Sequence, residues 1–200
     1  TSFLINSNDG GTKFHFFLNS EFDLVKNEIN EKEFLIKLEQ VSNDTYIKKY
    51  NIFSPINNNS SLNSKLELSG SSEDLFYTTS MEVNENLNQN ESDRYEYIFP
   101  NFSFTRNLSK NFDILGNLEF ASSGHSKLYN TNIKENILVN DLKYQSNDKI
   151  SSKGFVSNIK YLIKNFNSEA QKSTKYKSDY DSGLMGIFEY ENKLPLININ

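Results

Sequence analysis

The sequence predicts an all-β protein built from antiparallel, up-and-down strands, and three observations support this prediction. Apolar and polar residues alternate with a period of two in many segments, whereas helical periodicity is weak. Aromatic residues make up 14% of the chain although hydrophobic residues make up only 36%, so the apolar content is concentrated in large rings that are common in strands. The segments number roughly ten to twelve and run for roughly 8–13 residues, which is longer than the usual soluble strand and close to the length that crosses a bilayer.

The first half of the chain contains five of these alternating segments. They cover residues 12–25, 33–41, 44–53, 64–69 and 74–84. The last of them alternates most regularly, so that one side is apolar and the other polar. The apolar side carries Leu75, Tyr77, Met81 and Val83, and the polar side carries Glu82 and Asn84.

A hairpin over residues 94–120 is the most informative stretch of the chain. Its first arm, 94–106, contains Pro100, which has no backbone N–H for a sheet ladder. Large rings stand at odd positions before this proline and at even positions after it, as one inserted residue would produce, so we predict a β-bulge at Pro100. The second arm, 112–120, also has an apolar and a polar side: Phe112, Ile114, Leu118 and Phe120 against Asp113, Asn117 and Glu119.

The second half of the chain adds segments at 136–145, 154–166 and 184–190. The middle segment repeats the division into two sides, with Phe155, Ile159, Tyr161 and Ile163 against Asn158 and Lys160. A side that carries this much charge must be wet, because burying unpaired charges is costly.

The expected connections alternate in length along the chain. Short turns are predicted at 26–32, 70–73, 107–111 and 146–153, a medium connection at 85–93, and long polar connections at 42–62, 122–135 and 167–183. Tight turns at one end and long loops at the other are typical of an outer-membrane barrel. We therefore assign the apolar sides to lipid, the polar sides to the lumen of a transmembrane β-barrel, the turn at 107–111 to its periplasmic end and the connection at 122–135 to an outer loop.

Composition argues against several classes of function. The chain has no cysteine, hence no disulfide or thiolate metal site, and its net charge of −5 offers no basic surface for nucleic acid. No run of about 18 apolar residues is present to form a membrane-spanning helix. His15, expected in a strand, and His125, expected in an outer loop, are the only histidines, so we assign them surface or pore-lining roles and predict no enzyme and no cofactor.

Other polar residues have two interpretations each. The tyrosines Tyr95, Tyr97 and Tyr161 either form a girdle at a membrane interface or reflect ordinary strand propensity. Carboxylates on the polar sides either contact a partner in the lumen or simply lie in water. These carboxylates are Glu82, Asp113, Glu119 and Asp141.

Four segments resemble the barrel of the lipopolysaccharide-assembly outer-membrane protein LptD, the organic-solvent-tolerance protein family, in its alphaproteobacterial form. They are residues 43–52, 94–102, 140–144 and 164–168. The resemblance implies that residues 1–200 are an internal part of one larger barrel domain in the bacterial outer membrane. It also implies insertion of lipopolysaccharide into the outer leaflet, an LptE-like plug lipoprotein in the lumen, outer-membrane lipid around the wall and a periplasmic bridge that supplies the cargo.

The family pattern is incomplete in this sequence, and two other functions stay open. We expect the family's periplasmic N-terminal domain and its barrel-closing strands to be absent, and its disulfides have no counterpart in a chain without cysteine. A generic porin would share the alternation. A soluble all-β binding or adhesion module would instead bury the apolar side of residues 74–84 against a second sheet.

Overall fold

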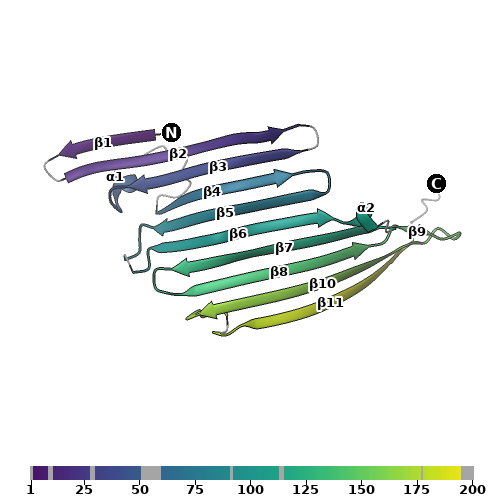
Figure 1. The fold of residues 1–200 in the computed structure, drawn as a ribbon. Helices are drawn as coiled ribbons and strands as arrows, with labels where there is room; N and C mark the ends of the chain where they lie inside the picture. Colours follow the sequence, from purple (N-terminus) through teal and green to yellow (C-terminus); the bar gives the residue numbers. More distant parts are fainter. Residues whose placement is uncertain are drawn as a thin grey trace, which may run out of the picture.

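The computed structural model describes residues 2–8, 11–27, 30–50, 60–90, 92–112, 115–176 and 178–194. Ten strands form one antiparallel meander in chain order, and the two-residue β9 pairs with β10 beside this path (Figure 1). The strands are β1 (Ser2–Asn8), β2 (Gly11–Lys26), β3 (Glu31–Val41), β4 (Ser61–Ser71), β5 (Leu75–Asn86), β6 (Tyr95–Asn107), β7 (Asn117–Tyr129), β8 (Lys134–Gln145), β9 (Lys149–Ile150), β10 (Val156–Gln171) and β11 (Asp181–Lys193).

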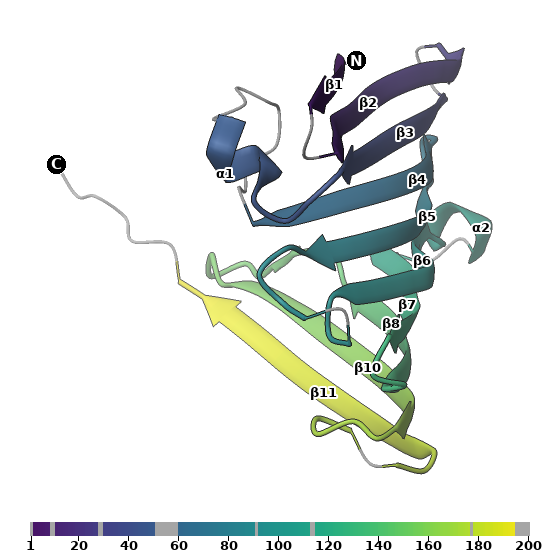
Figure 2. The same cartoon turned by 90° about the vertical axis from the view of Figure 1, so that its left-hand side faces the viewer.

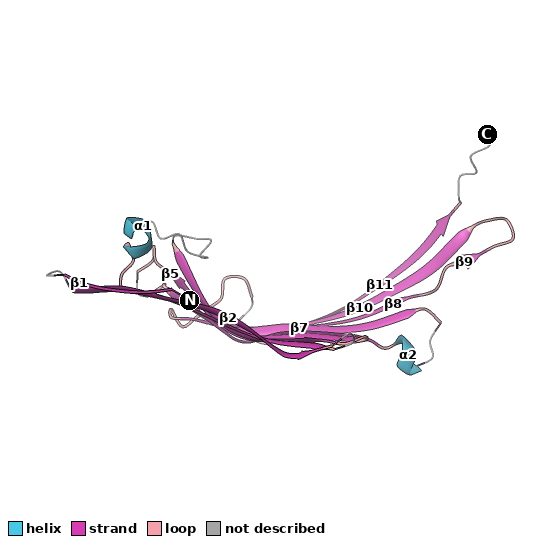
Figure 3. Cartoon of the chain, turned by 90° about the horizontal axis from the view of Figure 1, so that it is seen from above, coloured by secondary structure: helices cyan, strands magenta, loops and turns pink. Residues whose placement is uncertain are grey.

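The sheet is curved and open. Seen from above, β7 to β11 bend upward, and the helix α1 (Tyr46–Tyr50) lies on the concave side (Figure 3). The turned view separates the two ends of the sheet, with β1 and β2 at the top and β11 at the bottom (Figure 2). The prediction of an all-β, up-and-down antiparallel architecture is confirmed. Over the described residues the sheet does not close on itself, so barrel closure stays a prediction.

The expected strand at 44–53 is wrong over its central part. Residues Tyr46–Tyr50 form α1, and residues 51–53 lie outside the described residues. The helix begins at a turn in which the backbone N–H of Tyr46 donates to the carbonyl of Asn43 at 3.1 Å, and Asn is a favoured residue at helix starts. Neither α1 nor α2 (Ser109–Phe112) crosses a membrane, since no helix of the described chain is long and apolar enough.

The second arm of the predicted hairpin begins later than expected. The strand was predicted from residue 112, but it starts at Asn117. Phe112, expected in a strand, ends α2 and is 63% exposed, while Asp113 and Ile114 lie outside the described residues. Gly116 has a φ of 126°, a conformation that side-chain-bearing residues rarely adopt. The extended run can therefore begin only after this glycine, and β7 starts at Asn117.

Two of the expected long connections are largely strand. β7 continues to Tyr129, so the predicted outer loop at 122–135 shrinks to residues 130–133, and β10 and β11 extend into 167–183. The short turn expected at 107–111 falls in a connection that spans residues 108–116, which is the longer of the two that flank β7. The regular alternation of short and long connections is therefore wrong. Ser- and Asn-rich sequence resembles a loop locally, but neighbouring strands supply the ladder that holds it extended.

The predicted bulge at Pro100 is confirmed. Ser80 pairs with Asn101 and Glu82 with Ile98, so Phe99 and Pro100 together stand opposite one residue of β5. The register with β7 shifts at the same place. Tyr97 and Phe102 therefore share a face although their numbers differ in parity.

Two glycines on one face of the sheet allow a matched test of packing. A Cβ at Gly124 would lie 2.5 Å from the carbonyl oxygen of Ile137 and 3.0 Å from the ring of Phe102, whereas a Cβ at Gly186 meets nothing within 4 Å. We expect Gly124→Ala to lower the free energy of unfolding by about 1–3 kcal/mol, because the backbone must shift, and Gly186→Ala to leave it unchanged or slightly raised. Denaturant midpoints of the two variants measure the difference, and equal midpoints would contradict the close approach at Gly124.

Candidate functional site

The strand register places most charged side chains on one face of the sheet and most large apolar side chains on the other. Residues directly opposite one another in an antiparallel ladder share a face. His15 lies on the face that α1 covers, since its Nδ1 lies 3.3 Å from the hydroxyl of Tyr46, and this is the concave side (Figure 3). Following the ladder from β2 to β11 gives the concave residue of every strand.

The concave face carries a series of ion pairs that join neighbouring strands. Lys127 pairs with Glu96 at 3.0 Å, Lys143 with Glu119 at 3.1 Å, and Lys164 with Asp141 at 3.0 Å. Each pair joins residues of two adjacent strands, and the charges are only partly exposed. The face is therefore polar and largely charge-compensated, as the lining of a water-filled space would be.

Glu82 is held at the centre of this face by three groups. Its carboxylate accepts hydrogen bonds from the hydroxyl of Ser80 at 2.7 Å and from the amide of Asn101 at 3.1 Å, and it lies 3.6 Å from Lys65 Nζ. Lys65 also pairs with Glu67 of its own strand. A carboxylate with this many donors is fixed in place, so its role is to hold the network together.

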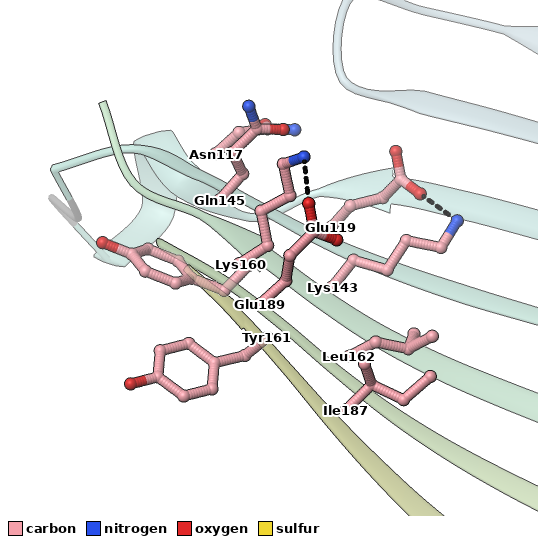
Figure 4. Close-up of a pocket in the computed structure, with 10 residues that line it drawn as sticks. Asn117, Glu119, Lys143, Gln145, Lys160, Tyr161, Leu162, Ile187 and Glu189 are labelled. Carbon is pink, nitrogen blue, oxygen red and sulfur yellow. Dashed lines mark hydrogen bonds and ion pairs between the residues drawn. The ribbon is translucent and has the colours of Figure 1, made fainter. Parts of the chain in front are cut away.

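A second group of charges lines a hollow of about 450 Å³ on β7, β8, β10 and β11 (Figure 4). Lys160 donates to Glu189 at 2.9 Å and lies 3.6 Å from Glu191, while Lys143 reaches Glu119 from the other side of the hollow. Asn117 and Gln145 lie next to these pairs at the same end. Amides and compensated charges here can hydrogen-bond a polar molecule without selecting strongly for its charge.

The polar residues singled out from the sequence lie on the concave face wherever the structure describes them. Asn84 accepts a hydrogen bond from Asn63 at 2.7 Å and donates one to Glu96 at 3.1 Å, and Asn158 donates to Asp148 and Glu191. Asp113 lies outside the described residues. The concave set is Glu82, Asn84, Asn117, Glu119, Asn158 and Lys160. Contact of these residues with a lumen stays a prediction.

The apolar residues singled out from the sequence lie on the convex face. Phe112 and Ile114 are the exceptions described above, and Phe155 lies just before β10 with 39% exposure. Several convex side chains are strongly exposed, among them Met81 at 46% and Ile163 at 48%. The convex set is Leu75, Tyr77, Met81, Val83, Leu118, Phe120, Ile159, Tyr161 and Ile163. A soluble surface rarely exposes so continuous an apolar area.

The apolar residues of the convex face form a band that runs obliquely across the strands. A register row is the line of directly paired residues that crosses the sheet at right angles to the strands. On β4 the band is centred near Leu66, and the register row of Leu66 continues through Met81, Ser126 and Asn136 to Glu169 on β10. On β10 the band is instead centred at Tyr161, eight residues before Glu169 and five strand-to-strand steps from β4. With about 3.3 Å per residue and about 4.8 Å per strand, the band is inclined by roughly 45° to the register rows.

No family model and no curated protein matches this chain. The resemblance to LptD therefore stays a prediction.

Aromatic rings cluster at two places on the oblique band. Tyr161 lies between Tyr144, at 6.2 Å, and Phe188, at 5.1 Å between ring centroids. Tyr95 and Tyr97 stack at 6.2 Å near the other end of β6. Tyr95 and Tyr97 thus stand toward one margin of the apolar band, where an aromatic girdle would lie, whereas Tyr161 lies at the centre of the band on β10.

The best-packed part of the described chain was not predicted from the sequence. Phe17, Ile47, Leu62 and Leu87 form a buried cluster in which α1 is held against the sheet. His15 is 7% exposed and stacks on Phe17 at 4.9 Å, so it lies on the polar concave face but is buried beneath α1. The signal available in the sequence was Tyr46-Ile47, an apolar pair inside an otherwise polar stretch.

Arg94 joins the segment before α1 to the β5–β6 connection. Its guanidinium lies 2.6 Å from Asp44 and 2.6 Å from Glu85, whose carboxylate also accepts from the hydroxyl of Tyr95 at 3.1 Å. Burial alone would lower the pKa of Arg94, but the hydrogen bonds to Glu85 and Asp44 and their charges raise it above its ordinary value. The arginine therefore stays charged and fixes the position of the polypeptide that leads into α1.

His125 lies within β7, so its expected place in an outer loop is wrong. It stands opposite Asn101 and Ile137 on the concave face, beside a hollow of about 410 Å³ floored by the small side chains of Thr78, Ser103 and Ser123. Among the described residues no three His, Cys, Asp or Glu side chains come together to hold a metal ion.

Proposed function

We propose that this chain is a segment of a transmembrane β-barrel of a bacterial outer membrane, and that the complete barrel inserts lipopolysaccharide into the outer leaflet. One observation carries the membrane part of the proposal: the apolar band is inclined to the register rows by roughly 45°. Strands of a transmembrane barrel are tilted by roughly 35–45°. If the band is parallel to the membrane plane, the strands of this sheet therefore have the tilt that a bilayer requires.

The opposite face agrees with this orientation. Paired charges such as Lys143–Glu119 need water, which a lumen supplies. The strand lengths fit as well, because β6 (Tyr95–Asn107) at a tilt of 45° rises by roughly 30 Å, the thickness of a bilayer core. A soluble module would have to cover the whole oblique band with a second layer.

A site-directed spin-label scan along β6 tests the membrane part. In the full-length protein in bilayers, labels at Tyr97, Phe102 and Phe104 are expected to be accessible to oxygen, and labels at Glu96 and Ser103 to water-soluble relaxants. The oxygen-accessible positions should change from odd to even residue numbers at Pro100, because the extra residue of the bulge reverses which side chains face the convex side. Water accessibility at every position would contradict the proposal.

The lipopolysaccharide part depends on the resemblance of residues 43–52, 94–102, 140–144 and 164–168 to the LptD barrel. Reconstitution of the full-length protein with a periplasmic bridge should deliver lipopolysaccharide to the outer leaflet of proteoliposomes. Steady ion conductance without lipid transfer would instead favour a porin.

A porin is the second candidate, and α1 is the observation that favours it. The helix lies on the concave face and is held there by Ile47 and by the Arg94–Asp44 pair, so it would narrow a lumen. Single-channel conductance that rises when α1 is released would support this alternative.

A further inference from the structure

The convex face changes character abruptly on β7, β8, β10 and β11. On β10, Ile163 is the last apolar residue of the oblique band, and Asn165, two positions along on the same face, begins a polar area. This area extends toward the end of the strands where β7 connects to β8 and β10 to β11. Its amide and hydroxyl residues are Ser122, Ser126, Asn136, Asn140, Asn165, Asn167 and Ser182.

Five of these side chains form a hydrogen-bonded ladder across the four strands, which reaches β11 where the hydroxyl of Ser182 donates to Asn167 at 3.0 Å. Ser122 donates to Asn140 at 2.8 Å, Asn140 donates to Asn165 at 3.3 Å, and Asn167 donates to Asn165. The hydroxyl of Tyr180 donates to Asn167 at 2.7 Å and brings the ring to the edge of the ladder. Neighbouring strands thus hold the amide groups in fixed orientations.

The ladder lines a groove of about 420 Å³, which we call the amide groove. Its convex walls are Asn136, Leu138, Asn140, Asn165, Asn167, Glu169 and Tyr180. Glu169 is the only charged side chain among the lining residues that the structure describes, and it accepts a hydrogen bond from Asn136 at 3.2 Å. Among the described lining residues there is no lysine or arginine, so the groove does not suit a phosphate or another anion.

The chemistry of the groove fits an uncharged sugar. Sugar hydroxyls both donate and accept hydrogen bonds, and a side-chain amide offers two donors and two lone pairs, so Asn140 and Asn165 can bind a ligand while keeping the ladder. The exposed ring of Tyr180 offers a flat apolar surface at the rim. The groove also borders the apolar band, so a lipid whose chains pack on Ile163 would place its headgroup beside Asn165.

We propose that the amide groove binds the uncharged saccharide headgroup of a membrane lipid at the outer wall of the sheet. The orientation of this lipid rests on the proposed membrane function. The site lies on the face opposite the ion pairs, so it is separate from any route through a lumen.

Native mass spectrometry of the full-length protein released from nanodiscs tests the proposal. The nanodiscs contain phosphatidylcholine and about one tenth digalactosyldiacylglycerol. We expect the protein to retain the galactolipid in preference to phosphatidylcholine, and Asn140→Leu/Asn165→Leu to weaken this retention about 25-fold, since each of the two lost hydrogen bonds is worth roughly fivefold. Asn192→Leu is the control, because Asn192 lies on the same face at the opposite end of β11.

The outcomes separate the two proposals. Equal retention of both lipids by the unchanged protein, or an unchanged preference in the double variant, would overturn the saccharide site. Binding of free galactobiose in detergent without preference for the galactolipid would overturn the lipid as its source. A protein that binds galactobiose but does not insert into nanodiscs would contradict the membrane function and leave the sugar chemistry of the groove intact.

Discussion

Met81→Arg is expected to lower the stability of the membrane-inserted protein by about 2–4 kcal/mol, whereas Thr78→Arg should cost much less. Met81 lies within the oblique apolar band and is 46% exposed, so an arginine there would enter the hydrocarbon region, where such a charge costs this amount near the midplane. Thr78 lies three residues earlier on the same strand, on the concave face, beside the hollow near His125. That hollow has room for a long polar side chain.

Urea-dependent unfolding of both variants from lipid vesicles measures this difference. The structure also explains why Glu82 is a poor position for the control. An arginine at Glu82 would stand next to Lys65 and would remove the acceptor of Ser80 and Asn101, so it would disturb the concave network for reasons unrelated to lipid. If Met81→Arg and Thr78→Arg lowered stability equally, the assignment of the convex face to lipid would be wrong.

Ile47→Ala is expected to release α1 from the concave face. Ile47 is 2% exposed and packs on Phe17, Leu62 and Leu87, and truncating such a side chain costs about 2–5 kcal/mol. A helix of five residues has little stability of its own, so most of this cost falls on its docking.

Thiol labelling reports the release directly, because the natural chain has no cysteine. A single cysteine introduced by Leu62→Cys should react with a maleimide at least about tenfold faster in the Ile47→Ala background. Lys48→Ala is the control, since the hydrogen bond of Lys48 to Asn88 is exposed and its loss should leave labelling slow. Fast labelling without Ile47→Ala would mean that the cluster beneath α1 is not closed.

The parts of the fold that were predictable are those that a short stretch of sequence determines. The bulge is an example, because Pro100 removes a ladder donor and the neighbouring rings change parity within a few residues. The alternation of β5 is another, since each side chain at residues 75–84 indicates its own face. Neither inference requires knowledge of which strand lies next to which.

The errors arose where neighbours decide the conformation. The segment at 122–129 is rich in Ser and small residues, yet β6 and β8 pair with it on both sides and hold it as strand. Conversely, the weak alternation of Tyr46–Tyr50 predicted a strand. The segment is instead a helix, because this conformation buries the side chains of Tyr46 and Ile47 against the sheet.

The candidate site shows the same division. Its polar residues could be assigned to one face from the sequence, but the partners of each charge depend on strand register. Lys143 lies 24 positions from Glu119, and no local pattern indicates that they pair. The inclination of the apolar band likewise depends on how neighbouring strands are aligned.

The outer edge of β11 has a consequence for handling the chain by itself. β11 pairs with β10 along one side, and over the described residues no strand lies along its other side. Its residues 184–190 combine large apolar side chains with an extended backbone, and no proline interrupts the strand. Such an edge is a template onto which a strand of a second chain can pair. Isolated chains in water would therefore be prone to assemble into ribbons in which sheets join edge to edge. The tendency to aggregate would then come from the folded sheet itself, and conditions that unfold the chain would relieve it.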